Sequence, residues 1–241
     1  MAPPGSTKDP SQAAADNERF QRFTSTTVHH LREPVRMIAA YTEMLQSAAG
    51  GLSGDALQSL EFLGKAALQM QRLLDGLSEF AAATAKLPRP PTLVRLELPL
   101  RQAVLGLDAD LKTAHAKVSY GDLPRVAGDY DRLQVVFHHL IQNALQYREP
   151  VRDPEISVQA RPDGEEWVIE VRDNGPGIPP EFVERVFELY SRLHGRSHPG
   201  NGLGLPICRA IIESLGGRMW VESKAGEGAT FCFTLHDQGG G

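Results

Sequence analysis

Apolar residues along the first third of the chain repeat with the period of a helix. No glycine occurs between about Asn17 and Ser47, and two rows of residues recur at seven-residue spacing. One row contains Thr24, Leu31, Ile38 and Leu45, and the next contains Phe20, Thr27, Pro34 and Tyr41. This heptad pattern predicts one long amphipathic helix.

A second helix is predicted after a short break rich in glycine, from Gly50 to Gly54. Its apolar residues step by threes and fours, at Leu60, Leu63, Ala67, Met70, Leu74, Leu77 and Ala81. The short turn makes the two helices antiparallel. Because two helices cannot enclose both apolar stripes, we expect this all-α hairpin to form a dimeric four-helix bundle with a second copy.

Beyond the proline-rich linker Leu87 to Pro91, the pattern changes to mixed elements. Helices are predicted near Leu98 to His115, Asp129 to Tyr147, Pro180 to Val186 and Leu205 to Leu215. Strands are predicted at Lys117 to Tyr120, Glu155 to Ala160, Glu166 to Arg172, Arg218 to Ser223 and Ala229 to Leu235. This order indicates an α/β two-layer sandwich. We therefore divide the chain into a linker or cloning-derived tail (1–16), a helical domain (17–86) and an α/β domain (92–236).

Composition limits the classes of function. The 241 residues are 41% hydrophobic and 23% charged, as in a soluble globular protein. No apolar run is long enough to cross a membrane and no targeting segment is evident, so we expect a cytoplasmic protein. A net charge of −5 argues against a nucleic-acid partner. Cys208 and Cys232 lie far apart without histidines at ligand spacing, which argues against a zinc site or a disulfide framework.

The first helix contains the segment VHHLREPVR, with two adjacent histidines. In the heptad frame, His29 falls in the outermost row, with Arg22, Arg36 and Glu43, and is expected to face water. His30 falls in the row of Phe23, Met37 and Met44, which flanks the core. Pro34 removes the helical partner of the His30 carbonyl at a cost of about 3 kcal/mol, so a bend or a loosened turn is expected there.

Three segments of the α/β domain carry residues suited to a nucleotide. In WVIEVRDNGPGIPP, a strand ends at Asp173, whose carboxylate can accept from an exocyclic amino group, and runs into a glycine turn. HPGNGLGLPIC is a glycine-rich loop that opens a helix, where N–H groups suit phosphate oxygens. In FHHLIQNALQYR, Asn143 and Tyr147 share a helix face and offer an amide oxygen for magnesium and a ring for a base. Each segment alone fits ordinary structure, and only their joint occurrence favours a nucleotide site.

With these motifs in this order, the chain resembles the sensor histidine kinases of two-component systems from about Phe20 to Leu235. FTSTTVHHLREP resembles their H box, HHLIQNALQYR the N box, VRDNGPGIP the G1 box, VFELYSRL the F box and GNGLGL the G2 box. The segment RLHGRSHPGNGLGLPIC is most similar to kinases of the phytochrome-associated type. The resemblance implies a Bergerat-type (GHKL) ATPase fold, shared with Hsp90, type II topoisomerases and MutL, in the second domain.

The resemblance also implies roles for individual residues around ATP. Asn143 would coordinate Mg²⁺, and Asp173 would bind the adenine amino group. The remaining residues would line the nucleotide: Tyr147 beside the base, Gly175 and Gly177 around it, and Gly202 and Gly204 at the phosphate-facing end of the ATP lid. Where the family often has Asn and Lys in the N box, this chain has His139 and Gln146.

The family motif places the phosphoacceptor at His29, the histidine that the helical frame also selects as exposed. Without the ATP motifs, that frame would fit an ordinary solvated histidine. His30 stands where the family usually has an acidic general base, and Glu33, one turn after His29, is a second candidate base. Phosphatase-competent members commonly carry Thr or Asn at the position of Glu33, so the resemblance does not extend to phosphatase activity.

These features predict an ATP- and Mg²⁺-dependent histidine autokinase that forms a homodimer through its hairpin and passes phosphate to the receiver domain of a response regulator. A dimeric scaffold that binds nucleotide but transfers little is an alternative, suggested by His30, His139 and Gln146. An ATP-gated clamp fits the ATP motifs but not the histidine hairpin.

Overall fold

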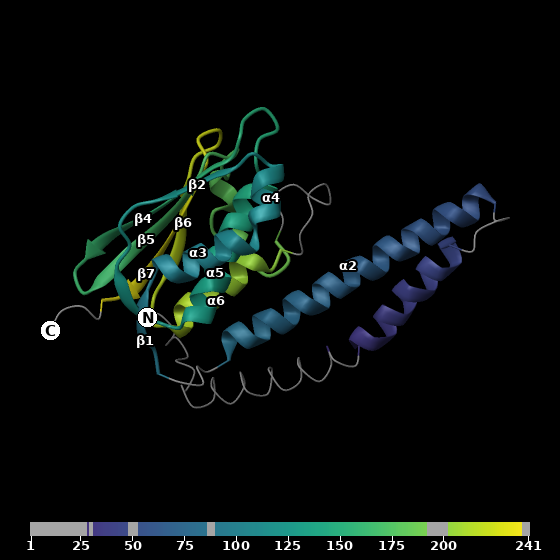
Figure 1. The fold of residues 1–241 in the computed structure, drawn as a ribbon, viewed down its shortest axis with the longest axis horizontal. Helices are drawn as coiled ribbons and strands as arrows, with labels where there is room; N and C mark the ends of the chain where they lie inside the picture. The colour runs from purple at the N-terminus through teal and green to yellow at the C-terminus, as the bar shows by residue number, and fades with distance from the viewer. Residues whose placement is uncertain (1–27, 29–30, 48–52, 86–89, 192–201, 238–241) are drawn as a thin grey trace, which may run out of the picture. The chain divides into compact units, whose positions relative to one another are not determined.

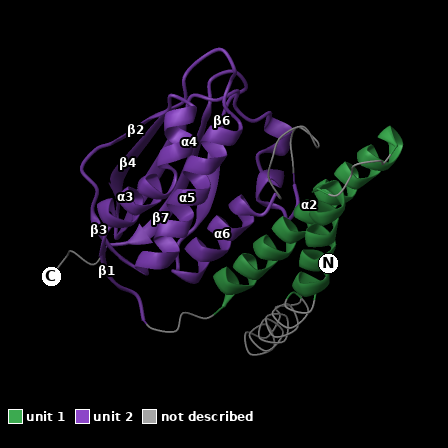
Figure 2. Cartoon of the chain, turned by 45° about the vertical axis from the view of Figure 1, so that its right-hand side comes forward, with its two compact units in different colours: residues 1–85 green, residues 86–241 purple. Residues whose placement is uncertain are grey.

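The computed structural model describes residues 28, 31–47, 53–85, 90–191 and 202–237. The chain divides into two compact units, residues 1–85 and 86–241 (Figure 2). Each unit has its own architecture, helical in the first and α/β in the second.

The first unit contains two antiparallel helices. One covers residues 31–47, and the other is α2, Gly54–Thr84, whose N-cap Ser53 accepts from the Ala56 N–H. Arg32 contacts Asp75 near one end of the pair, at 2.9 Å. Further along, a Cβ on Gly64 would lie 3.4 Å from Thr42 Cγ2. These contacts confirm the predicted antiparallel hairpin.

The row of residues that packs within this hairpin differs from the predicted core rows. Val28, Val35 and Thr42 are 2–5% exposed, and the two valines form a cluster with Leu74. The predicted core residues remain largely exposed in the single chain: Leu31 at 46%, Ile38 at 48%, Leu45 at 54% and Tyr41 at 57%. The physical reason is that one helix–helix contact covers only one stripe, and the predicted rows would need further helices to cover them.

In the second unit, a five-stranded sheet has the order β2-β4-β5-β7-β6. Its strands are β2 (Lys117–Tyr120), β4 (Glu155–Asp163), β5 (Glu166–Asp173), β6 (Met219–Ser223) and β7 (Ala229–His236). Only β2 and β4 pair in parallel. The five predicted strands are thus confirmed to within a few residues at their ends.

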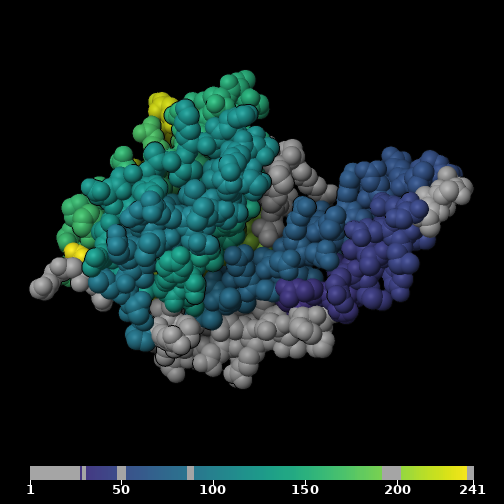
Figure 3. Space-filling view, in the orientation of Figure 1, coloured from purple at the N-terminus to yellow at the C-terminus, as the bar shows by residue number. Residues whose placement is uncertain are grey.

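Helices cover one face of this sheet, as Figures 1 and 2 show. They are α3 (Glu97–Gly106), α4 (Asp108–Thr113), α5 (Tyr130–Gln146) and α6 (Gly204–Ser214). In the space-filling view, side chains of the helical layer close over the strands (Figure 3). Phe137 of α5 meets Phe233 of β7 edge-on, with 6.0 Å between the ring centroids, so the apolar core lies between helices and sheet. The two-layer sandwich is confirmed.

Two local predictions were wrong, and one element was missed. The single helix predicted from Leu98 to His115 is two helices, because the chain turns at Leu107, whose φ of −109° and ψ of 11° are not helical. The segment predicted as a helix from Pro180 to Val186 forms two single 3₁₀ turns, Pro180–Phe182 and Arg185–Phe187. A small antiparallel sheet of β1 (Thr92–Arg95) and β3 (Arg125–Gly128) was not predicted at all.

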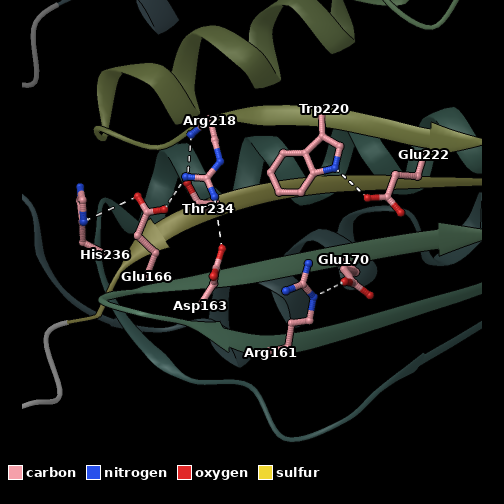
Figure 4. Close-up of polar contacts among 9 residues, drawn as sticks. All are labelled: Arg161, Asp163, Glu166, Glu170, Arg218, Trp220, Glu222, Thr234 and His236. Carbon is pink, nitrogen blue, oxygen red and sulfur yellow. Dashed lines mark hydrogen bonds and ion pairs between the residues drawn. The ribbon is translucent and has the colours of Figure 1, made fainter.

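The other face of the sheet is covered by a layer of ion pairs (Figure 4). Arg218 contacts Glu166 at 2.7 Å and Asp163 at 3.3 Å, and Arg161 contacts Glu170 at 2.9 Å. On the same face, Cys232 is 1% exposed, and burial raises the pKa of its thiol to about 12. Cys232 is therefore an inert thiol, and both cysteines are buried thiols that form no disulfide, as expected.

Candidate nucleotide site

Helix α5 supplies two of the predicted site residues. It begins at Asp129, whose side chain accepts from the Arg132 N–H at 3.0 Å, and it buries a regular apolar face against the sheet. Asn143 and Tyr147 lie at its carboxyl end, where the Asn143 carbonyl accepts from the Tyr147 N–H at 3.0 Å. Both side chains are partly buried. The side-chain amide of Asn143 makes no hydrogen bond to another described residue, so it is available to a ligand.

Asp173 lies at the end of β5, partly buried in the central part of the sheet. Its Oδ1 accepts from two backbone N–H groups, that of Gly175 at 2.8 Å and that of Ala229 at 3.3 Å. Its Oδ2 has no hydrogen-bond partner among the described residues. Burial raises the pKa of Asp173, while the two backbone hydrogen bonds and the nearby Arg152 and Arg172 oppose the rise. One carboxylate oxygen is thus fixed and the other can accept from a ligand.

The glycines of the turn after Asp173 allow three segments to meet. A Cβ on Gly175 would lie 2.8 Å from Asp173 Oδ1 and 3.3 Å from the Tyr147 carbonyl oxygen. Gly177 has φ +74°, and its Cβ would lie 2.2 Å from the Lys224 carbonyl oxygen, a distance that no side chain tolerates. The structure therefore brings Asp173, Gly175, Gly177 and Tyr147 together at one end of the sheet.

The turn between β6 and β7 forms part of this site, and the sequence interpretation missed it. Gly228 has φ +86°, and a Cβ there would lie 2.1 Å from the Asp173 carbonyl oxygen. The Ser223 Oγ accepts from the Ile178 N–H at 2.8 Å and donates to the Gly228 carbonyl at 2.7 Å. The glycine spacing of GEGAT, just before a predicted strand, was the signal that could have revealed it.

A second clamp, also missed, holds the turn from the loop after α5. Arg152 Nη2 donates to the Gly175 carbonyl at 3.1 Å, and Arg152 also pairs with Glu149 at 3.5 Å. The Asn174 side chain accepts from the Glu155 N–H at 2.9 Å and donates to the Asp153 carbonyl at 3.0 Å. Arg152 from outside the recognised motif and Asn174 from inside it therefore both tie this turn to the segment that follows α5.

The two predicted phosphate-side glycines contact different segments, Gly202 the Tyr190–Ser191 backbone and Gly204 helix α5. Gly202 has φ +68°, its carbonyl accepts from the Tyr190 N–H at 2.9 Å, and a Cβ would lie 2.8 Å from the Ser191 carbonyl oxygen. Gly204 begins α6, and its Cβ would lie 3.2 Å from His139 Nδ1. His139 precedes Asn143 by one turn on α5, so the start of α6 lies beside the helix that carries the predicted magnesium ligand. Residues 192–201 lie outside the described part of the chain.

The predicted phosphoacceptor His29 and its neighbour His30 lie outside the described residues. Glu33 is exposed and pairs with Arg36 at 2.8 Å in the helical unit. Arg36 and Glu43, which share the predicted row of His29, are both exposed in the single chain, as are Leu31 and Ile38 of the predicted core row. Pro34 lies inside the helix 31–47, whereas the bend or loosened turn predicted at His30 lies outside the described residues.

Two features are absent from the residues that the structure describes, a metal-binding cluster and a membrane span. No group of three or more His, Cys, Asp or Glu side chains there could hold a metal ion. None of the helices there combines the length and the hydropathy that a membrane span requires.

Two family models match consecutive parts of the chain. Residues 21–86 match the His Kinase A (phospho-acceptor) domain, and residues 128–239 match the histidine kinase-, DNA gyrase B- and HSP90-like ATPase.

Among relatives, Cyanobacterial phytochrome A of Nostoc sp. (strain PCC 7120) is 35% identical over 231 residues, which are 93% of this chain and 30% of that protein. The Methanogenesis regulatory histidine kinase FilI of Methanothrix harundinacea is 36% identical over 227 residues, 93% of this chain and 25% of that protein. The chain thus spans less than a third of the length of these relatives.

Solved structures show the same fold. Full-length ShkA in complex with AMPPNP has a TM-score of 0.67 at 23% identity and is matched over 89% of this chain and 45% of that one. The histidine kinase ThkA in complex with the response regulator protein TrrA has a TM-score of 0.62 at 19% identity, over 93% of this chain and 64% of that one. With both family models, in the order in which kinases carry them, and with phytochrome and kinase relatives, the chain belongs to the sensor histidine kinases.

Proposed function

We propose that this chain binds ATP, transfers the γ-phosphoryl group to an imidazole nitrogen of His29, and then passes it to an aspartate of a response regulator. The observation that carries the proposal is the meeting of Asp173, Gly175 and Tyr147 at one end of the sheet, within a domain of the kinase ATPase family. The phosphoacceptor model over residues 21–86 supports the second substrate, a histidine of the same protein.

In this proposal, Asp173 selects adenine. Its Oδ2 accepts from the exocyclic amino group, while Oδ1 remains held by the Gly175 and Ala229 N–H groups. Tyr147 places its ring beside the base. Gly177 packs closely on the Lys224 carbonyl, and this packing holds the turn in the shape that leaves room for the ligand. Gly202 and Gly204 leave backbone N–H groups at the start of α6 for phosphate oxygens, where the helix dipole also favours anions.

The residues present fit a magnesium ion that is held mainly by the nucleotide. Mg²⁺ usually keeps several waters and binds through one or two protein oxygens together with substrate phosphates, so the absence of an acidic cluster among the described residues is compatible with it. Asn143 is the residue that would hold it. When bound, the ion neutralises charge on the phosphate oxygens.

The transfer exchanges one bond to phosphorus for another. The lone pair of an imidazole nitrogen of His29 attacks the γ-phosphorus, the bond to the bridging oxygen breaks, and ADP leaves with that electron pair. The imidazole loses a proton to a base, for which Glu33 and His30 are the candidates. Glu33 pairs with the exposed Arg36, an ion pair worth less than about 1 kcal/mol at a surface, so this pairing leaves the carboxylate free to change partners.

A homodimer and a response regulator complete the proposal. The exposed apolar stripe of Leu31, Ile38, Tyr41 and Leu45 supports dimerisation through the hairpin, since a second copy would cover it. The phosphoacceptor domain supports a receiver-domain partner, which takes the phosphoryl group from phosphohistidine.

Incubation with γ-labelled ATP and Mg²⁺ tests the function. The wild-type chain should gain label that is labile in acid and stable in base. His29→Gln should abolish the label, His30→Gln should retain it, and Asn143→Ala should reduce it strongly. Label retained in His29→Gln would overturn the acceptor assignment, and nucleotide binding without any label would favour a non-transferring scaffold.

A further inference from the structure

The hydroxyl of Ser223 connects two segments that surround Asp173. Ser223 is the last residue of β6, and its Oγ accepts from the Ile178 N–H at 2.8 Å and donates to the Gly228 carbonyl at 2.7 Å. We infer that Ser223 is a positioning residue for adenine recognition, which acts by holding the β6–β7 turn against Asp173. The inference rests on the proposed nucleotide site and adds to it a determinant of base selectivity.

The path from Ser223 to Asp173 has few steps. Ser223 pairs with Ala229 in the register of β6 and β7, and the Ala229 N–H donates to Asp173 Oδ1. Gly228, held by the Ser223 hydroxyl, packs on the backbone of Asp173 so closely that a Cβ would lie 2.1 Å from the Asp173 carbonyl oxygen. A shift of this turn would therefore change both the backbone and the carboxylate of Asp173.

The same hydroxyl also holds the far end of the glycine turn. Ile178 follows Gly177, and Gly177 packs on the Lys224 carbonyl of the β6–β7 turn. Ser223 thus stands between the segment that carries Gly177 and the segment that carries Ala229. A backbone hydrogen bond also joins the two segments, from the Gly226 N–H to the Pro176 carbonyl at 2.7 Å. Ser223 is the side chain that hydrogen-bonds both Ile178 and Gly228, whereas Arg152 reaches the Gly175 carbonyl from the loop after α5.

A hydroxyl is the group that this position needs. It donates one hydrogen bond and accepts another in the same place, and Gly228 and Ile178 are both buried. Alanine would leave a buried N–H and a buried carbonyl without partners, so the turn would move to find water or other partners. Threonine keeps the hydroxyl, and its β-branched side chain suits the end of a strand.

The test compares the affinity for ADP with that for inosine diphosphate (IDP), which has a carbonyl oxygen in place of the exocyclic amino group. Wild type should prefer ADP, because Asp173 Oδ2 accepts from that amino group. Ser223→Ala should reduce the ratio of the two affinities about tenfold, and Ser223→Thr should restore it to within about twofold of wild type. Ser119→Ala is the matched control, because Ser119 Oγ also contacts a backbone carbonyl, at 3.4 Å, but on the edge strand β2.

Isothermal titration calorimetry on the full chain measures both affinities, and thermal unfolding measures stability alongside. A role in stability alone would weaken ADP and IDP equally, and that result, or an unchanged ratio in Ser223→Ala, would overturn the inference. If the alanine variant does not fold, Ser223→Cys replaces it and should show a ratio of ADP to IDP affinity between those of wild type and the expected alanine value. A wild-type ratio in Ser223→Cys would also overturn the inference. A wild-type chain that binds neither nucleotide would refute the proposed site itself, and with it this inference.

Discussion

Replacing Asp173 with asparagine should separate nucleotide binding from stability. Asp173 Oδ1 accepts from the Gly175 and Ala229 N–H groups. In Asp173→Asn, the amide oxygen must take this position, because an NH₂ group cannot accept. The NH₂ group then occupies the position of Oδ2 and faces the adenine amino group, a donor opposed to a donor.

The expected loss of affinity follows from that geometry. A hydrogen bond to a charged group contributes about 1.5–3 kcal/mol, so its removal weakens binding about 10- to 100-fold. Because the variant also opposes two donors, we expect the loss at the upper end of that range. Calorimetric titration with ADP, in wild type and in Asp173→Asn, measures it directly.

Stability should change in the opposite direction. Burial raises the pKa of Asp173 in the folded state above its usual value. The folded state therefore holds the proton more tightly than the unfolded state, and the ionised carboxylate destabilises the fold at neutral pH. This penalty is absent below about pH 3.9, where the unfolded chain also protonates the group, and is complete above the raised folded pKa.

The nucleotide-free variant should therefore melt at a higher temperature than wild type at pH 7, with the difference closing as the pH falls toward about 3.9. Asp122→Asn, which removes an exposed carboxylate after β2, controls for the general loss of a negative charge. Wild-type affinity for ADP in Asp173→Asn would refute the adenine assignment. A lower melting temperature at pH 7 would refute the electrostatic reasoning.

Three further predictions use other parts of the chain. Gly228→Ala should lower the free energy of unfolding by more than about 2 kcal/mol, because its Cβ would overlap a backbone oxygen at 2.1 Å. Gly226→Ala is the control, also at φ +86° but with open space around it, and should lower the free energy of unfolding by about 1–2 kcal/mol. Denaturant titration compares the two variants. Arg152→Ala should weaken ADP binding about fivefold by releasing the Gly175 carbonyl, and equal binding would show that this clamp is dispensable. The double variant Ile38→Asp and Leu45→Asp should convert a dimer to monomers by light scattering, and an unchanged mass would refute dimerisation through this stripe.

Where the sequence was informative, the pattern was long and regular. The predicted helix from Asp129 to Tyr147 corresponds to α5 with its two caps, because an Asp N-cap and seven buried apolar residues at helical spacing leave little choice. The five strands of the main sheet were found for a similar reason, since apolar runs bounded by turn residues mark buried strands.

The missed elements are short, and long-range pairing forms them. Strands β1 and β3 have four residues each, too few to show alternation, and Leu93 pairs with Ala127 across more than thirty residues of chain. No local pattern predicts such a contact, because loop closure and packing decide it. The heptad pattern also does not predict which row of apolar residues packs within one hairpin. Val35 and Ile38 are equally apolar, yet only Val35 is buried in the single chain.

The candidate site was predicted in its ligand-facing residues and missed in its supporting ones. Asp173, Gly175 and Gly177 sit in a recognisable motif, whereas Arg152 and Ser223 are common residue types in unremarkable surroundings. They matter because of where the fold places them. Arg152 binds the Gly175 carbonyl, and Ser223 binds both Ile178 and Gly228.

This division has a physical basis in how the carboxylate is held. Only one oxygen of Asp173 is fixed, and both of its donors are backbone N–H groups, so its position depends on backbone geometry at two separate turns. Backbone geometry is set by groups that contact carbonyls and N–H groups from outside the motif, here a guanidinium and a hydroxyl. Adenine selectivity in this chain should therefore be sensitive to residues that never touch the nucleotide, and variants of Ser223 and Arg152 should change base preference before they change the fold.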